Sequence, residues 1–473
     1  MIKDPREPNV KSEIKSTLSG QRLQPSGRIH IPKKGWIPRI ITISILVGLI
    51  SYNLYQGIKI LDPFILHASI VLIDALIVVT VGWSFYKNPA KGIAGNALVS
   101  VLIPVYNQKN MISIVIDAIA NSTYKNIEII AVNDGSTDGS KEILDDLAKK
   151  YPSLRVFHKK NEGKRKANFL GFSKSTGEFV IFIDSDSVVD QHAVIEMMKT
   201  FSVNPGVGAL VGHIKAWNSK THLLPKLQDA WYDFEFNILK TTQSTLGHVM
   251  VCSGCFAAYR REAIEKFVPL WNGTNNLEKN LDPKKYFKTN PWRYRIFSKI
   301  PIKILEWASQ FDDAEDSVLT AQVLIDWKTK YVSTSIVYTD VPETLKGFTK
   351  QQLRWRKGYL RAMFFVVTFL WQKNPLLSFM FYVNVIALVT MPIILFTMFY
   401  YGPLVLHQYG FVVAFFLGVI GIGFAHGIDY KFRDPTSKNW KFRPLMNILM
   451  AFLFSFLTIP ALLTFRKSSW LTR

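Results

Sequence analysis

The stretch Phe179-Val-Ile-Phe-Ile-Asp-Ser-Asp186 decides the fold, because five apolar residues typical of a buried strand run directly into an acidic pair. Two similar runs precede it, at 97–104 and 127–132, and the second leads into Asn133-Asp134-Gly135-Ser136. Strands that alternate with helical stretches predict an α/β domain with a mostly parallel sheet. Because ligands bind beyond the carboxyl ends of such strands, both acidic segments are expected at a binding site.

The pair Asp184 and Asp186 is a candidate metal site. Residues two apart in an extended chain point the same way, so the two carboxylates repel each other unless a cation joins them. Mg²⁺ or Mn²⁺ with a diphosphate fits, since such ions take one or two carboxylates plus substrate phosphates. The alternatives are a turn or helix cap for this pair, and an ordinary turn for Asn133-Asp134-Gly135-Ser136.

Uncharged runs gather towards both ends of the 473-residue chain, at 40–58, 375–428 and 444–465, while 63–86 is interrupted only by Asp74. A helix needs about 20 apolar residues to cross a bilayer. We therefore expect two transmembrane helices over 39–88, a soluble domain over 97–345 and two more transmembrane helices over 375–428. The cysteines, Cys252 and Cys255, are too few for a disulfide framework or a four-cysteine zinc site.

The net charge of +22 follows the membrane-flanking segments. Residues 1–39 hold nine Lys and Arg against three acidic residues, and 429–443 hold five against two. The positive-inside rule therefore places the tail 1–38, the domain, the basic loop 429–443 and the tail 466–473 in the cytosol of a multi-pass cell (plasma) membrane protein. The lipid bilayer is the expected partner of this charge, and no nucleic acid is expected.

Two segments next to the membrane have a mixed character. Residues 346–374 combine basic residues with Phe, Leu and Trp, which is typical of amphipathic helices at the cytosolic interface. Residues 444–465 predict a transmembrane, interfacial or re-entrant helix, because Pro460 interrupts the run.

Five motifs, in chain order, resemble the processive family 2 glycosyltransferases of membranes. They are Val132-Asn133-Asp134-Gly135-Ser136, Gly163-Lys164-Arg165, Asp184-Ser185-Asp186, Glu315-Asp316 and Gln351-x-x-Arg354-Trp355. The resemblance covers residues 35–473. It implies a GT-A catalytic domain inserted between transmembrane helices, in an enzyme that couples polymer synthesis to export.

Within that family the chain looks most like hyaluronan synthases and chitin-oligosaccharide synthases. Cys252-Ser253-Gly254 resembles an acceptor-site segment, and Trp470-Leu471-Thr472-Arg473 resembles a gating tail that closes over the nucleotide. Leu471 replaces a Gly of that pattern, Cys255 replaces a Pro, and the connection 267–310 is longer than usual. Residues 342–347 also match poly-N-acetylglucosamine synthases, so that product class stays open.

The resemblance implies a role for each matched residue. The donors would be UDP-sugars, namely UDP-GlcNAc with UDP-glucuronate, and the acceptor would be the growing polysaccharide. Asp316 would be the catalytic base, while Asp186 and Asp184 would bind the Mg²⁺ or Mn²⁺ cofactor. The nucleotide would contact Pro104, Tyr106, Asp134, Lys164, Asp184, Arg354, Trp470 and Arg473. The acceptor at the channel mouth would contact Trp355, Gln351 and Cys252.

Two other functions compete with this interpretation. A non-processive transferase acting on lipid phosphates shares the first three motifs but normally lacks Gln-x-x-Arg-Trp. A transporter without chemistry would explain Asp74 inside an apolar run. It would not need the pair Asp184 and Asp186 together with Asp316. The sequence predicts no particular oligomeric state.

Overall fold

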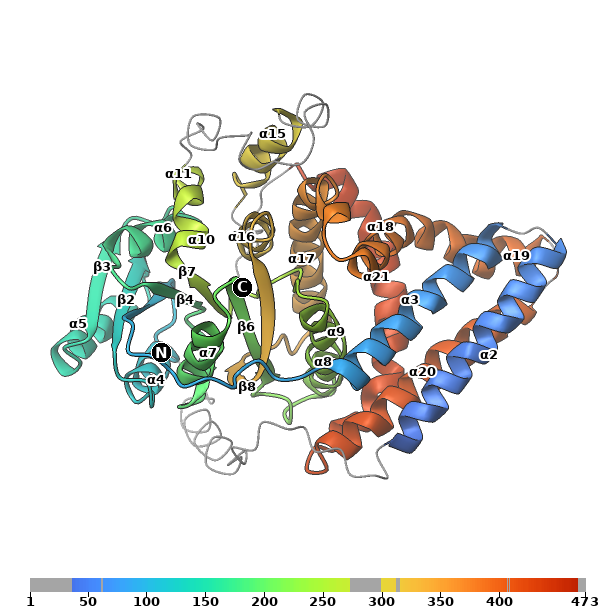
Figure 1. Cartoon of the computed structure of the whole chain (residues 1–473), viewed down its shortest axis with the longest axis horizontal. Helices are drawn as coiled ribbons and strands as arrows, with labels where there is room; N and C mark the ends of the chain where they lie inside the picture. The colour runs from blue at the N-terminus through green and yellow to red at the C-terminus, as the bar shows by residue number, and fades with distance from the viewer. Residues whose placement is uncertain are drawn as a thin grey trace.

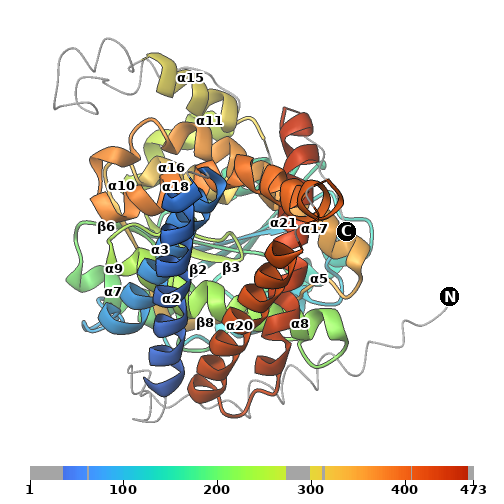
Figure 2. The same ribbon diagram turned by 90° about the vertical axis from the view of Figure 1, so that its right-hand side faces the viewer.

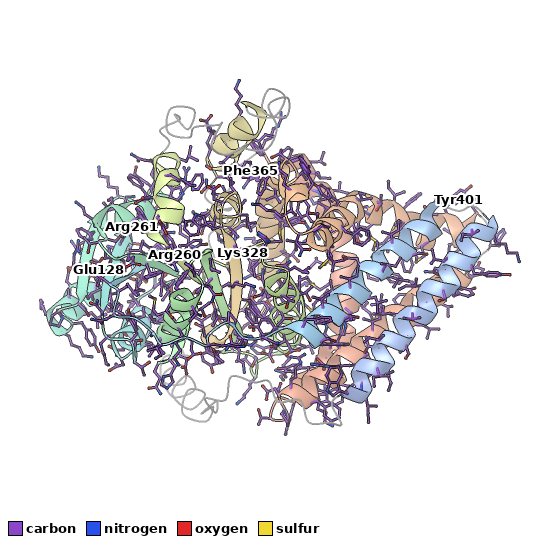
Figure 3. The ribbon with its side chains drawn as sticks, viewed as in Figure 1. Glu128, Arg260, Arg261, Lys328, Phe365 and Tyr401 are labelled. Atoms are coloured by element: carbon purple, nitrogen blue, oxygen red, sulfur yellow. The ribbon has the colours of Figure 1, made fainter. Side chains whose placement is uncertain are left out.

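The computed structural model describes residues 36–60, 63–272, 299–311, 315–405, 407 and 409–466. An α/β domain forms one side of the molecule and long helices form the other (Figure 1). Glu128 and Tyr401 lie near the opposite ends of this arrangement (Figure 3). The predicted site residues Trp470 and Arg473, and residues 273–298 of the long connection, lie outside the described residues.

The described part of the domain is built on one eight-stranded sheet with the order β3-β2-β1-β4-β7-β6-β8-β5. Its strands are β1 (Val99–Val105), β2 (Ile127–Asp134), β3 (Leu154–Lys159), β4 (Phe179–Ile183), β5 (Val188–Val189), β6 (Val207–Ala216), β7 (Phe256–Arg260) and β8 (Lys328–Thr339). Four pairings are parallel, and the three that join β7 to β4, β7 to β6, and β5 to β8 are antiparallel. The α/β fold is confirmed: most pairings are parallel, and the sheet is mixed because β7 runs antiparallel between β4 and β6 and β5 runs antiparallel to β8.

Helices cover the sheet and complete the domain. They are α4 (Ile112–Ala120), α5 (Ser140–Lys150), α6 (Lys164–Lys174), α7 (Ala193–Val203), α8 (Leu223–Phe234), the π-helix η2 (Glu235–Leu239), α9 (Lys240–Thr245), α10 (Arg261–Ile264), the 3₁₀ turn η3 (Glu265–Phe267), α11 (Val268–Trp271), α15 (Lys299–Ala308) and α16 (Glu315–Val323). Helix α4 is an example of how these helices pack: it buries one apolar face, formed by Ile112, Val115, Ile116 and Ile119 at helical spacing.

The register of the parallel strands brings the acidic segments to one edge of the sheet. Strands β1 and β4 are buried at every position, as their apolar sequences predict. Val105 at the end of β1 pairs with Asn133 near the end of β2, and β4 pairs with β1 on its other side. Tyr106, Asp134 and Asp184 therefore leave neighbouring strands at the same carboxyl edge.

The remaining helices form a bundle beside this domain. They are α2 (Trp36–Ile60), α3 (Pro63–Phe85), α17 (Leu345–Val366), the 3₁₀ turn η5 (Leu370–Gln372), α18 (Pro375–Phe396), the π-helix η6 (Thr397–Tyr401), α19 (Gly402–Leu404), α20 (Gly410–Arg433), the 3₁₀ turn η7 (Asn439–Phe442) and α21 (Arg443–Thr464). Helices α2 and α3 run side by side (Figure 1), and α2 lies next to α20 (Figure 2).

Length and composition identify two helices in the described chain that can cross a membrane, Trp36–Tyr55 and Asn439–Thr464. A third candidate is the pair Pro375–Leu388 and Thr390–Leu404, which is bent by 49°. Helix α21 continues through Pro460. The break that this proline suggested is therefore not seen. The hydroxyl of Thr464 donates to the Pro460 carbonyl in the preceding turn.

A buried ion-pair network joins the bundle to the α/β domain. Arg39 of α2 lies 2.7 Å from Asp429 of α20, which also accepts from Arg433 one turn later at 2.7 Å. The Arg433 guanidinium in turn donates to both carboxylate oxygens of Asp233 in α8, at 2.6 and 2.5 Å. Two bundle helices and one domain helix are thereby held in a single arrangement.

Candidate active site

A cavity of ≈ 2520 Å³ opens at the carboxyl edge of the sheet and extends among the bundle helices. Most of the site residues predicted from the sequence line it. They are Pro104, Tyr106, Asp134, Lys164, Asp184, Asp186, Asp316, Gln351, Arg354 and Trp355. The structure thus brings together segments as far apart in the chain as Pro104 and Trp355.

Asp134 is held by the loop that follows β3. Its two carboxylate oxygens accept the backbone N–H groups of Glu162 and Gly163 at 3.0 and 2.9 Å, and Lys159 donates to it at 2.8 Å. The intervening turn is tight, because Gly135 has φ +72° and a Cβ there would lie 2.7 Å from the Asn161 nitrogen. Asp134 is consequently a fixed acceptor at the cavity edge rather than an exposed turn residue.

Lys164 joins the two acidic segments of the site. Its ammonium lies 2.7 Å from Asp184 and 2.5 Å from Glu315. Burial alone would lower the pKa of Lys164, but the two carboxylates outweigh that effect and raise it. Burial raises the pKa of Glu315, against the attraction of Lys164. The lysine therefore stays charged and fixes the start of α16 against the end of β4.

Asp184 and Asp186 both line the cavity, although Ser185 and Asp186 form a turn after β4 rather than a continuation of the extended strand. No group of three or more His, Cys, Asp or Glu side chains converges within the described chain. The donor set fits Mg²⁺ or Mn²⁺, because these hard cations accept one or two carboxylates and draw further oxygens from substrate phosphates.

Asp316 lies in the first turn of α16, and its carboxylate is oriented by neutral donors. The backbone N–H of Gly254 donates to Oδ2 at 3.2 Å, and that of Ser317 donates to Oδ1 at 2.6 Å. Within the described chain Asp316 has no ion-pair partner, whereas its neighbour Glu315 is paired with Lys164. Asp316 is thus available to accept a proton from a group bound in the cavity.

Cys252 does not lie on the cavity wall, although the sequence suggested that it meets the acceptor. Its side chain is fully buried, and burial raises the pKa of its thiol to about 12. Its backbone N–H donates to the hydroxyl of Thr320 in α16 at 2.9 Å. The neighbouring Ser253, Gly254 and Cys255 line the cavity instead.

The helix α17 carries Gln351, Arg354 and Trp355 into the cavity. The Trp355 side chain is 39% exposed, and its ring centroid lies 6.2 Å from that of Trp231 in α8. Two indole rings on facing helices form an apolar platform of the kind that stacks on the C–H face of a sugar.

Many lining residues were not predicted from the sequence, among them Trp231, Lys240 and Arg443. Trp231 and Lys240 come from α8 and α9, where no motif marked them, and Arg443 begins α21 inside what was predicted to be a basic loop. The π-helix η2, which directly precedes Lys240, indicates that this segment belongs to a functional site, because such irregular turns often occur there. That irregularity is visible only in the structure.

Comparison with known proteins gives this geometry a family context. Residues 100–268 match the family described as glycosyl transferase family 2. The chain is 28% identical to a hyaluronan synthase of Streptococcus pyogenes over 436 residues, covering 90% of this chain and 95% of that protein. It is 27% identical to a poly-beta-1,6-N-acetyl-D-glucosamine synthase of Staphylococcus epidermidis over 260 residues, covering 55% and 54% respectively.

A solved structure confirms the fold. A mannosyltransferase from Pyrobaculum calidifontis, determined in complex with GDP-Man and Mn²⁺, matches with a TM-score of 0.52 at 15% identity. The match covers 84% of this chain and 97% of that one. The GT-A-like catalytic fold predicted from the sequence is therefore present here, flanked by helices that include candidate membrane spans.

Proposed function

We propose that this chain, which is a glycosyltransferase with a family 2 catalytic domain, is a processive, inverting β-glycosyltransferase embedded in the cell membrane. It polymerises UDP-sugars on the cytosolic side and exports the polysaccharide through its helices. Helices α2, α3, α18 and α20 would span the bilayer. Helix α17 would lie at the cytosolic interface, and α21 would span or enter the bilayer.

The continuity of the cavity carries this proposal. Its domain half is lined by the acidic residues at the sheet edge, and its bundle half by Asn384 of α18 and by Asn447, Ser455 and Thr458 of α21. Polar side chains on inward faces of apolar helices are expensive in a membrane and mark pathways for polar cargo. A sugar chain made at the sheet edge can therefore pass Trp355 and continue among the helices.

The transfer chemistry is assigned to residues of the site. Asp316 removes the proton from the acceptor hydroxyl, whose oxygen then attacks the anomeric carbon of the donor. UDP leaves from the opposite face, which inverts the configuration at that carbon. Trp355 and Gln351 position the acceptor, while Asp134, Tyr106 and Pro104 hold the nucleotide. Lys164 and Arg354 would stabilise the negative charge that gathers on the leaving diphosphate, and the tail residues Trp470 and Arg473 would close over it.

A divalent cation, Mg²⁺ or Mn²⁺, would be held by Asp186 and Asp184 and would neutralise the diphosphate of the leaving group. The mannosyltransferase of similar fold was solved with Mn²⁺, which supports this assignment. In the structure Lys164 occupies one oxygen of Asp184. The lysine and the cation would therefore share this carboxylate when the donor binds.

UDP-GlcNAc together with UDP-glucuronate is our leading donor pair, because the similarity to the hyaluronan synthase spans nearly the whole of both chains. A polymer of GlcNAc alone, chitin-like or β-1,6-linked, is the second candidate. It is favoured by the similarity to the poly-N-acetylglucosamine synthase, which covers about half of each chain.

Purified full-length protein incubated with labelled UDP-GlcNAc, with and without UDP-glucuronate, tests this proposal. We expect a polymer that requires both donors and that hyaluronidase degrades. A polymer made from UDP-GlcNAc alone and degraded by chitinase or a β-1,6-specific hydrolase would select the second candidate. The absence of any sugar transfer from UDP-sugars would refute the proposed function.

A further inference from the structure

Arg443 is a buried cation on the cavity wall for which the described residues provide no ion pair. It begins α21, its side chain is only 6% exposed, and it lines the cavity wall. Its Nε and Nη1 atoms are buried and have no hydrogen-bond partner within the described chain. Burying a guanidinium without hydrogen-bond partners costs free energy of folding unless an anion pairs with it.

The acidic residues Asp233 and Glu235 do not supply the missing ion pair for Arg443, because they are already paired with other residues. Asp233 already receives both terminal nitrogens of Arg433 and a further hydrogen bond from Asn237 at 2.9 Å. Glu235 is paired with Lys240 at 3.5 Å. The Arg443 guanidinium lies over the ring of Phe234, with 4.5 Å between its Cζ atom and the ring centroid. A ring face attracts the cation but cannot accept its hydrogen bonds in the plane of the guanidinium.

The position of Arg443 is fixed by close helix packing. In α20, Gly423 and Gly427 lie one turn apart, as in the small-xxx-small pattern that lets membrane helices approach. A Cβ at Gly423 would lie 2.5 Å from the Pro444 Cα, and one at Gly427 would lie 2.6 Å from the Trp440 carbonyl oxygen. The first turn of α21 is thereby clamped against α20, and Arg443 is held at the cavity.

Arg443 also begins a polar row that faces the cavity. Asn447, Ser455 and Thr458 line the same cavity from the same helix. Residues about four positions apart share one face of a helix, so this row follows the path proposed for the polymer. Amide and hydroxyl groups suit sugar hydroxyls, whereas a guanidinium suits a carboxylate, which it binds through two parallel hydrogen bonds.

We propose that Arg443 forms a carboxylate-binding subsite for the growing chain, so that the polymer carries an acidic sugar and one of its carboxylates pairs with this guanidinium. The inference rests on the proposed function, because it takes the cavity to be the path of the polymer. It adds a reason for an acidic product that is independent of sequence similarity. Each elongation step would move the next acidic unit towards this site.

Binding of matched oligosaccharides to the full-length protein tests the subsite. The probes are a hyaluronan decasaccharide and a chitin oligosaccharide of similar length, followed by tryptophan fluorescence, since Trp231 and Trp355 line the cavity. Arg443→Gln should weaken binding of the acidic probe about tenfold, the effect of losing one charge-assisted pair of about 1.4 kcal/mol. Binding of the neutral probe should be unchanged.

Two further variants sharpen the test. Arg443→Lys should retain part of the preference for the acidic probe, because the charge remains while the bidentate geometry is lost. Lys441→Gln is the matched control, since Lys441 is exposed, does not line the cavity and lies two residues away. It should bind both probes as the wild type does. The melting temperature of each variant shows whether it is folded.

The possible outcomes distinguish a failure of the Arg443 subsite from a failure of the proposed function. Unchanged binding of the acidic probe by folded Arg443→Gln, or an equal loss for both probes, would overturn the subsite even if the wild type makes a polymer. Failure of the wild type to transfer sugar from any UDP-sugar would instead refute the proposed function. Selective loss of the acidic probe, with partial rescue by lysine, supports the subsite.

Discussion

Asp316 and Glu315 are adjacent carboxylates at the start of α16, and the structure gives them different surroundings. Glu315 is neutralised by Lys164, while Asp316 accepts only N–H and O–H groups of neighbouring residues within the described chain. Asp316→Asn should therefore reduce polymer formation by about 10²–10⁴-fold, the usual effect of losing a general base. Binding of the UDP-sugar, measured by calorimetry, should persist.

The control for this variant is Glu262→Gln, which removes an exposed carboxylate from α10 far from the cavity wall. It should polymerise at the wild-type rate. Wild-type activity of Asp316→Asn would move the role of base to another carboxylate, with Glu315 as the first to be tested.

A second prediction at the residue scale concerns the cation. If Asp186 holds it, Asp186→Asn should abolish turnover while the protein still folds, because the diphosphate charge is no longer neutralised. EDTA should inactivate the wild type, and Mn²⁺ or Mg²⁺ should restore activity. Full activity in EDTA would contradict the metal assignment.

Residues were predictable where a motif and a strand end coincide. Asp134, Asp184 and Asp186 follow apolar runs, and parallel strands bring such ends to one edge, so their convergence followed from local sequence. The pairing of Lys164 with both Asp184 and Glu315 depends on how α6, β4 and α16 meet, and no local pattern encodes that. Cys252 shows the limit of such matches, since a motif does not reveal which of its side chains is buried and absent from the cavity wall.

At the scale of elements, the contact between α20 and α21 makes a sharp prediction. Gly423→Ala would place a methyl group 2.5 Å from the Pro444 Cα, whereas Gly421→Ala, in the same helix, meets nothing within 4 Å. Overpacking of this kind costs about 1–3 kcal/mol. We expect Gly423→Ala to lower the melting temperature in detergent, measured by fluorescence-detected size-exclusion chromatography.

Gly421→Ala should be neutral or slightly stabilising, because alanine has the higher helix propensity. Equal melting temperatures for the two variants would show that the close contact of the two helices is absent in solution.

The elements themselves were largely predictable from hydrophobic patterning. Apolar runs marked β1, β2 and β4, and longer uncharged runs marked α2 and α21. The antiparallel direction of β7 could not be predicted. Neither the hydrophobic period nor the composition of a short apolar strand determines which strand it pairs with. The π-helix η2 was hidden for a similar reason, since its residues read as ordinary helix.

At the scale of the whole molecule, the buried ion-pair network holds the helix bundle against the catalytic domain. Asp429 is fully buried between Arg39 and Arg433, so Asp429→Asn would leave two buried guanidinium groups with too little negative charge. Removing one partner of a buried pair costs roughly 3–5 kcal/mol. We expect a large loss of thermal stability and of polymer synthesis together, measured on the same preparation.

The matched control is Asp146→Asn, whose partner Lys149 is as exposed as the aspartate itself. Exposed pairs of this kind contribute about 0–1 kcal/mol, so this variant should melt as the wild type does. Wild-type stability of Asp429→Asn would mean that the network does not hold the two parts together.

The central claim is that one continuous cavity makes and guides a polymer, and product length during a pulse and chase tests it most directly. Purified protein is given a short pulse of labelled donors and then an excess of unlabelled donors. A processive enzyme keeps each chain in the cavity, so the account predicts that labelled chains grow steadily to high mass during the chase. Labelled products that stay short while new short chains appear would contradict it.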